Sequence, residues 1–228
     1  MLQRSPVGRV DTPCRKLLQR VWLVLVLCLV AGPALAASRP LILVMGDSLS
    51  AAYGIERQDG WVSLMADRLT GKARVVNASI SGETTAGGKT RLPELLGQHD
   101  PDIVLLELGG NDGLRGLPPT QMRANLAAMI EASQASGARV ALLGIDIPPN
   151  YGQAYRDAFT EVFTTLAQRY EVPLVPFLLD EVALNDDLVQ DDGIHPTAAA
   201  QPRVLDNVWP ILAPLLETSG VELARRQE

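Results

Sequence analysis

Cysteine and histidine are rare in this sequence of 228 residues. The two cysteines, Cys14 and Cys28, lie in the first 36 residues, which we expect to be removed from the mature protein. The mature chain would then have no disulfide, no cysteine nucleophile and no cysteine-ligated metal. The two histidines are His99 and His195. A site with three histidine ligands is therefore excluded, and a histidine general base has two candidates.

Positive charge and aromatic residues are also scarce. The net charge is −6, and aromatic residues make up 4% of the chain. Non-specific binding of nucleic acid depends on cationic side chains, so we expect no nucleic-acid partner. The chain has no repeat or low-complexity tract, and its 47% hydrophobic and 20% charged residues are ordinary for a globular protein. This composition disfavours a disordered, collagen-like or coiled-coil chain.

The first 36 residues have the composition of a secretory signal peptide. Five basic residues stand against one acid, an apolar run follows, and residues 34–36 read Ala-Leu-Ala. Cleavage near Ala36 would leave a periplasmic or secreted bacterial protein without a stable membrane anchor, and would change the net charge from −6 to −10. One alternative is an uncleaved anchor, although the uncharged stretch is shorter than the about 20 residues that span a bilayer. The other is a lipoprotein, although the large Leu27 precedes Cys28.

Beyond residue 40, strand-like and helix-like segments alternate. The continuous apolar run at residues 41–45 is typical of a strand buried on both faces. Further strand-like segments occur at residues 74–78, 103–106, 140–145 and 172–175. Apolar residues at helical spacing occur at residues 60–69, 122–130, 155–166 and 204–215. The alternation predicts one α/β domain over residues 37–228. We expect a three-layer sandwich with a doubly wound, parallel, five-stranded sheet of the flavodoxin-like kind.

Ligands bind such a sheet beyond the carboxyl ends of its strands. Ser48 follows the first strand, Gly82 the second and Asn111 the third. Each has an ordinary explanation, Ser48 as a helix N-cap and the other two as turn residues. The functional alternative is a serine nucleophile with the Gly82 N–H and the Asn111 amide as donors to an oxyanion. The G-x-S-x-G motif of the α/β-hydrolases is absent.

Asp192 and His195 stand three positions apart near the end of the chain, with Gly193 between them. A carboxylate at this spacing can fold back to accept the Nδ1–H of the imidazole, which leaves the other nitrogen as a base. The alternatives are a solvated loop and a weak metal site, which has too few ligands for zinc. His99 precedes the third strand, so we expect it in a surface loop at the opposite end of the sheet.

In their order and positions, these segments resemble the signature blocks of the SGNH hydrolases, also called the GDSL family. The resemblance covers residues 41–216 and is closest to a branch of secreted bacterial esterases with thioesterase, lysophospholipase and arylesterase activities. Residues 76–82, 107–116 and 190–196 match that branch almost residue for residue. The resemblance implies hydrolysis of small acyl esters and thioesters without a metal or organic cofactor. We expect a monomer.

The resemblance also implies roles for individual residues. Ser48 is the nucleophile, His195 the general base and Asp192 the acid that orients it. The oxyanion hole consists of the N–H groups of Ser48 and Gly82 and the side chain of Asn111. The acyl pocket is expected at two segments that contain Gly113, Leu114, Ile147, Pro148 and Tyr151. Gly113 and Gly116 would let the first of these segments move.

Two other functions remain open at this point. A carbohydrate O-acetylesterase of the same fold needs exposed aromatic side chains, but Trp61 and Trp209 lie on predicted helices. A non-catalytic binding module of this fold would not need Ser48, Asp192 and His195 to be intact.

Overall fold

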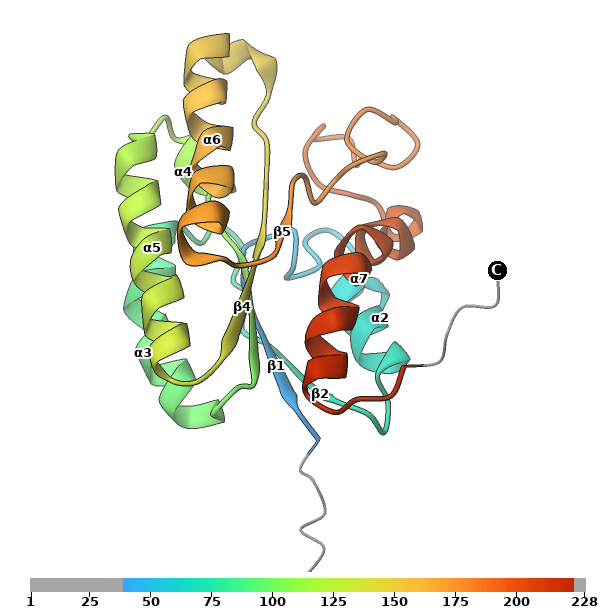
Figure 1. Ribbon diagram of the computed structural model, residues 1–228. Coiled ribbons are helices and arrows are strands. Elements are labelled where there is room, and N and C mark those ends of the chain that lie inside the picture. The colour runs from blue at the N-terminus through green and yellow to red at the C-terminus, as the bar shows by residue number, and fades with distance from the viewer. Residues whose placement is uncertain (1–38, 224–228) are drawn as a thin grey trace, which may run out of the picture. The chain divides into compact units, whose positions relative to one another are not determined.

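Five parallel strands form the centre of the protein in the computed structural model, which describes residues 39–223 (Figure 1). They are β1 (Leu41–Gly46), β2 (Arg74–Asn77), β3 (Ile103–Glu107), β4 (Arg139–Leu143) and β5 (Leu174–Val175). The order across the sheet is β2-β1-β3-β4-β5, and every neighbouring pair is parallel. This order is that of a doubly wound, flavodoxin-like sheet, so the predicted fold is confirmed. The predicted signal peptide of residues 1–36 lies outside the described residues.

The apolar runs of the central strands form β-structure because both faces of the sheet are buried there. In β1, Ile42 and Val44 pack into the core on one face of the sheet, whereas Leu43 and Met45 pack into the core on the other. All four side chains are completely buried. A strand covered on both sides needs an apolar residue at every position, which explains why the sequence shows continuous rather than alternating hydrophobicity.

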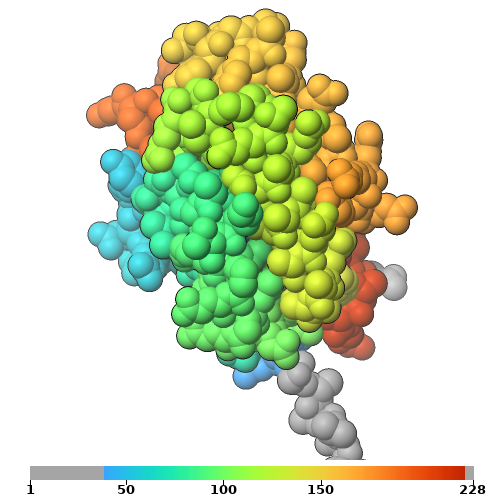
Figure 2. All heavy atoms as spheres, turned by 90° about the vertical axis from the view of Figure 1, so that its left-hand side faces the viewer, coloured from blue at the N-terminus to red at the C-terminus, as the bar shows by residue number. Residues whose placement is uncertain are grey.

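Helices cover both faces of the sheet (Figure 1). On one face lie α2 (Trp61–Arg68) and α7 (Gln201–Thr218). On the other lie α3 (Thr85–His99), α5 (Pro119–Ala135) and α6 (Gln153–Tyr170), with α3 beside α5 (Figure 2). The shorter helices are α4 (Gly110–Leu114), η1 (Arg57–Asp59), η2 (Pro149–Tyr151) and η3 (Ala198–Ala200). The three predicted layers are therefore present.

The sequence pattern did not predict α3. Three glycines and Pro93 interrupt its helical spacing, and each lowers helix propensity. The helix forms because Leu92 and Leu96 are buried against the sheet and the Thr84 hydroxyl caps its first turn. The prediction that His99 lies in a loop was wrong, since it is the last residue of α3.

The register of the sheet determines which loops meet. Gly46 at the end of β1 pairs with Glu107 at the end of β3, and Val44 pairs with Asn77 at the end of β2. The segments that follow these three strands therefore leave the sheet at the same edge. Between residues 39 and 223, no helix is both long and apolar enough to span a membrane.

Candidate active site

Ser48 and His195 are 147 positions apart in the sequence and in direct contact in the structure. Ser48 Oγ lies 2.8 Å from His195 Nε2, and His195 Nδ1 lies 2.6 Å from Asp192 Oδ2. A carboxylate at Nδ1 favours the tautomer with its proton on that nitrogen. Nε2 is then free to accept the proton of the serine hydroxyl, which is the arrangement of an activated nucleophile.

The loop that carries Asp192 folds back on itself as its spacing predicts. Asp192 Oδ1 accepts hydrogen bonds from the backbone N–H groups of Ile194 and His195, at 2.9 and 3.0 Å. Burial raises the pKa of Asp192, but these bonds and the contact with the His195 side chain outweigh it and lower the pKa to about 2. Asp192 is therefore a carboxylate at neutral pH.

Two further residues, to which the sequence analysis assigned no role, support the position of His195. The ring of Tyr53 packs against the imidazole, with 4.4 Å between the ring centroids. Gln190 Nε2 donates to the carbonyl oxygens of Tyr53 and Pro196, at 2.9 and 3.0 Å. Tyr53 carries no sequence signal, because it is distant from His195 in the chain, whereas Gln190 lies in the 190–196 segment that the sequence analysis matched as a block.

A tight turn after β1 presents Ser48. Gly46 is required there, because a Cβ atom at this position would lie 2.7 Å from Glu107 Oε2 and 2.8 Å from Ser50 Cβ. The N–H of Leu49 then donates to Asp47 Oδ1 at 3.0 Å, which closes the turn around Ser48. Within the described residues, the hydroxyl of Ser48 bonds to His195 and caps no helix.

Three donor groups belong to residues that line the cavity beside Ser48. Asn111 Nδ2 donates one hydrogen to Asp47 Oδ2 at 3.0 Å. A carboxylate only accepts, so this bond fixes the orientation of the amide and leaves the second Nδ2–H for the cavity. The backbone N–H groups of Ser48 and Gly82 donate to no other group of residues 39–223. All three residues line the same cavity, as an oxyanion hole requires.

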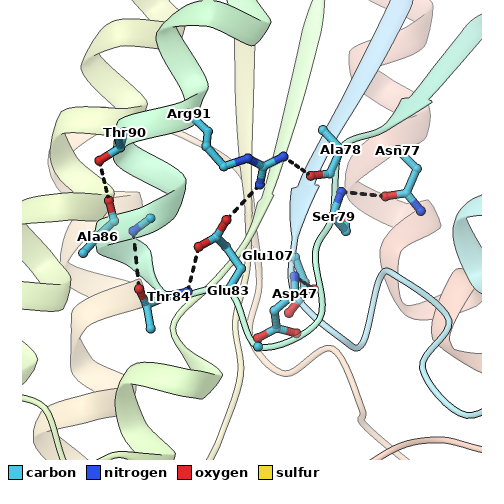
Figure 3. Close-up of polar contacts among 12 residues, drawn as sticks. Asp47, Asn77, Ala78, Ser79, Glu83, Thr84, Ala86, Thr90, Arg91 and Glu107 are labelled. Carbon is cyan, nitrogen blue, oxygen red and sulfur yellow. Dashed lines mark hydrogen bonds and ion pairs between the residues drawn. The ribbon is translucent and has the colours of Figure 1, made fainter.

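Two arginines hold the loop of residues 78–84 in place. Arg91 of α3 donates to Glu83 Oε2 and to the carbonyl of Ala78, both at 2.9 Å (Figure 3). Arg115, which follows α4, donates to the carbonyl of Gly82 at 3.0 Å. Gly82 has a φ of +81°, which glycine adopts without strain. These contacts hold the loop that carries the Gly82 N–H.

The buried carboxylate of Asp112 joins α4 to the start of α3. It accepts hydrogen bonds from the N–H and the hydroxyl of Thr85, at 2.8 and 2.6 Å. Asn125 of α5 donates to the same hydroxyl at 3.1 Å. Asp112 therefore fixes the distance between the segments that carry Asn111 and Gly82.

A model of the GDSL-like lipase/acylhydrolase family matches residues 44–202 of this chain. That span contains Ser48, Gly82, Asn111 and His195, which line the cavity, and Asp192, which bonds to His195. The chain belongs to this family.

Relatives within the GDSL family resemble the chain over most of their length. It is 52% identical to the esterase TesA of Pseudomonas aeruginosa over 183 residues, which cover 79% of this chain and 91% of the relative. It is 45% identical over 181 residues to thioesterase 1/protease 1/lysophospholipase L1 of Escherichia coli K12, with 79% of this chain and 87% of the relative covered. The crystal structure of the esterase EstA from Pseudoalteromonas sp., inhibited by monoethylphosphonate, matches with a TM-score of 0.74 and 43% identity, over 78% of this chain and 98% of that chain.

The GDSL-family site opens into a cavity of about 510 Å³. Leu114, Ile147 and Pro148, which the sequence analysis expected in an acyl pocket, line it. Gly113 and Tyr151 do not line it and lie behind this wall. Gly113 is buried in α4 next to Ile147, and the Tyr151 hydroxyl donates to the carbonyl of Leu114 at 2.7 Å.

The segment after Asn111 is more constrained than its glycines suggest. Residues 110–114 form α4, and the chain then continues to α5. Tyr151 and Tyr155 donate from their hydroxyl groups to the carbonyls of Leu114 and Leu117, both at 2.7 Å. Movement of this segment stays a prediction, and it would require breaking both bonds.

The sequence analysis did not predict a second group of residues that line the cavity. It comes from the segment between β5 and α7 and consists of Phe177, Leu179, Ala183, Leu184 and Ile194. The cavity also contains one ion pair, in which Arg156 Nη2 lies 2.5 Å from Asp146 Oδ2. No group of three or more His, Cys, Asp and Glu side chains in the described residues is arranged to hold a metal ion.

Proposed function

We propose that the protein is a serine esterase that hydrolyses acyl esters and thioesters. The observation that carries this proposal is the continuous hydrogen-bonded chain from Asp192 through His195 to Ser48 at an apolar cavity. The names of the relatives, esterase and thioesterase 1/protease 1/lysophospholipase L1, support ester and thioester substrates.

In the proposed reaction, Ser48 Oγ attacks the acyl carbonyl while His195 Nε2 takes its proton. The negative charge that develops on the carbonyl oxygen is stabilised by the N–H groups of Ser48 and Gly82 and by the Asn111 amide. His195 then gives the proton to the leaving alcohol or thiol. A water molecule repeats the sequence on the acyl-enzyme, releases the carboxylic acid and restores Ser48.

The acyl chain would lie on the apolar wall formed by Leu114, Ile147 and Pro148. Each buried methylene contributes about 0.8 kcal/mol, so such a wall favours medium-length chains over acetyl groups. An aromatic surface on which a sugar ring could stack is less well supported. Trp61 is buried, and the Arg68 guanidinium covers the ring of Trp209 at 3.6 Å. Acyl esters and thioesters are therefore preferred over acetylated carbohydrates.

We also infer that residues 1–36 are removed on export and that residues 37–228 work in the periplasm or outside the cell. The mature domain would act as a monomer, since one chain supplies the nucleophile, the base, the orienting acid and the three oxyanion donors. The basic and apolar composition of residues 1–36 supports the export step.

The test compares the wild-type domain with Ser48→Ala and His195→Ala on a p-nitrophenyl acyl ester and an acyl-CoA thioester. We expect each variant to lose kcat by about 10⁴-fold or more, as for other serine triads. His99→Ala is the matched control and should keep wild-type activity, because His99 lies at the end of α3. A fluorophosphonate should label the wild type and not Ser48→Ala. Turnover or labelling that persists in folded Ser48→Ala would contradict the proposal.

A further inference from the structure

Two buried carboxyl groups lie beneath the turn that carries Ser48, and the proposed reaction uses neither of them. Asp47 is 2% exposed and Glu107 is completely buried. They come from the adjacent ends of β1 and β3 and lie close together (Figure 3). Within residues 39–223 neither forms an ion pair with a lysine or arginine. Such a pair is costly to bury unless it holds a proton.

The hydrogen bonds of the two groups point to different protonation states. Asp47 accepts at both oxygens, from the N–H of Leu49 and from Asn111 Nδ2, as a carboxylate does. Glu107 accepts only at Oε2, from the N–H of Asp47 at 3.1 Å and the hydroxyl of Ser50 at 2.7 Å. Its Oε1 is buried, and no donor in the described residues reaches it. A neutral acid tolerates this environment better than a carboxylate does.

The electrostatics of the pair agree with that assignment. Burial and the neighbouring charge of Asp47 hold the pKa of Glu107 well above its usual value. Burial also raises the pKa of Asp47, to about 6, against the opposing effects of its hydrogen bonds and of His195. The titratable groups that change the pKa of Asp47 are therefore Glu107 of β3 and His195 of the 190–196 loop. The titratable group that changes the pKa of Glu107 is Asp47. Both effects favour a proton on Glu107 rather than on Asp47.

We propose that Asp47 and Glu107 form a proton-sharing pair that positions the oxyanion hole. Glu107 stays neutral and holds the turn through the Asp47 N–H and the Ser50 hydroxyl. Asp47 stays ionised and aims the Asn111 amide, so that its second N–H faces the reacting carbonyl. Both are positioning residues that act through Asn111 and the turn. This inference rests on the proposed function, because it assigns Asn111 to the oxyanion.

A change in the protonation of Asp47 would alter the Asn111 donor. Protonated Asp47 can donate a hydrogen bond, so the amide can rotate and present its oxygen to Asp47. The oxyanion then faces a carbonyl dipole with the wrong sign. kcat should therefore fall in acid as Asp47 takes up a proton.

The decisive variant is Asp47→Asn, which keeps the shape and removes one acceptor. Its amide cannot accept from both Leu49 and Asn111, so we expect kcat to fall at least 10-fold, toward the about 10²–10³-fold cost of a lost oxyanion donor. KM should stay within about 2-fold, because the donor acts mainly in the transition state. The fall of kcat at acidic pH should then involve one ionisation fewer in Asp47→Asn than in the wild type.

Glu107→Gln is the conservative partner variant. Its carboxamide oxygen can accept from the Asp47 N–H and the Ser50 hydroxyl, as Oε2 of the neutral acid does. We expect kcat within about 3-fold of the wild type, whereas Glu107→Leu should reduce it at least 10-fold. Asp102→Asn is the matched control, since Asp102 accepts from the Leu41 N–H at the other end of the same strands. It should leave kcat and its pH profile unchanged.

The outcomes separate this inference from the proposed function. Wild-type kcat and an unchanged pH profile in Asp47→Asn, together with normal phosphonate labelling of Ser48, would overturn the pair and leave the esterase standing. Absence of labelling in the wild type would instead remove the proposed function. A merely structural role for the pair predicts that activity falls only with the folded fraction, measured by urea unfolding of each variant. That result would also overturn the inference.

Discussion

Asn111 has two donor hydrogens on its side chain, and the fold uses one of them for Asp47. The other is free only because the carboxylate fixes which end of the amide faces the cavity. A turn residue would not need this arrangement, since Asn is accepted in turns for its backbone conformation. The two roles therefore predict different results for removal of the side chain.

Asn111→Ala should lower kcat by about 10²–10³-fold, or roughly 2.7–4 kcal/mol, with little change in KM. The reason is that the lost donor faces charge that exists only near the transition state. Steady-state kinetics on several acyl esters would measure it, and every ester should be affected alike. Asn125→Ala is the comparison, because Asn125 is a buried amide that bonds to Thr85 outside the cavity. It should lower thermal stability more than kcat, and an unchanged kcat in folded Asn111→Ala would contradict the prediction.

Single residues were predictable where the chemistry is local. The spacing of Asp192 and His195, and the position of Ser48 after a strand, suggested the three residues that the structure brings together. Glu107 gave no such signal, because its partners lie 57 and 60 positions away and its charge state depends on burial. Tyr53 is another example, since nothing near it in the sequence indicates contact with His195.

Elements were predictable where hydrophobicity alone decides them. All five strands were expected close to their observed positions. The apolar runs of β1, β3 and β4 reflect their burial, whereas β2 and β5 are only partly buried. α3 was not predicted, because its stability comes from packing against α5 and the sheet rather than from the helix propensity of its residues. The same helix supplies Arg91, which holds the loop that contains Gly82. Because the helix was not predicted, the role of Arg91 was not predicted either.

Arg91→Met tests that support at the level of the element. Methionine keeps the apolar stem and removes both hydrogen bonds to the 78–84 loop. We expect the free energy of unfolding to fall by on the order of 1–2 kcal/mol and amide exchange in the loop to accelerate, because two charge-assisted bonds to a partly buried segment are lost. Urea unfolding and hydrogen exchange by mass spectrometry would measure these effects.

Arg115→Met is the comparison for that experiment. Arg115 is exposed and makes a single bond to the loop, at the Gly82 carbonyl, so its effect on stability should be smaller. An equal loss of stability in the two variants, or no change in exchange in Arg91→Met, would show that the loop is held by other contacts.

At the scale of the whole domain, the site exists only when the sheet is assembled. Ser48 follows the first strand, Asn111 the third, and His195 precedes the last helix. The exposed large apolar residues of the described chain are Tyr53, Ile80, Leu184 and Ile194. Three of these four line the cavity, so the exposed apolar surface gathers where an acyl substrate would enter.

The same assembly makes global stability depend on pH through the buried acid. The pKa of Asp47 is raised from 3.8 to about 6 in the folded state. Between these values the folded protein keeps the proton that the unfolded chain has lost, so stability falls as pH rises from about 4 to 6. Asp192 has the opposite sign, since its pKa is lowered to about 2, and its contribution is lost as pH falls below 3.8. The two effects therefore occupy separate pH ranges.

Asp47→Asn should remove the fall in folding stability that occurs as pH rises from about 4 to 6. Relative to the wild type, the variant should gain stability steadily between pH 4 and pH 6, by on the order of a few kcal/mol, because each pKa unit corresponds to about 1.4 kcal/mol. The pKa of Glu107 should fall in the same variant, since the charge of Asp47 is one cause of its rise, and this change acts in the same direction. Urea unfolding of residues 37–228 at pH 4, 5, 6 and 7 would measure the difference, with Asp102→Asn as the control. Parallel stability curves for the wild type and Asp47→Asn would mean that Asp47 is already ionised at pH 4 in the folded protein, and that burial does not control its charge.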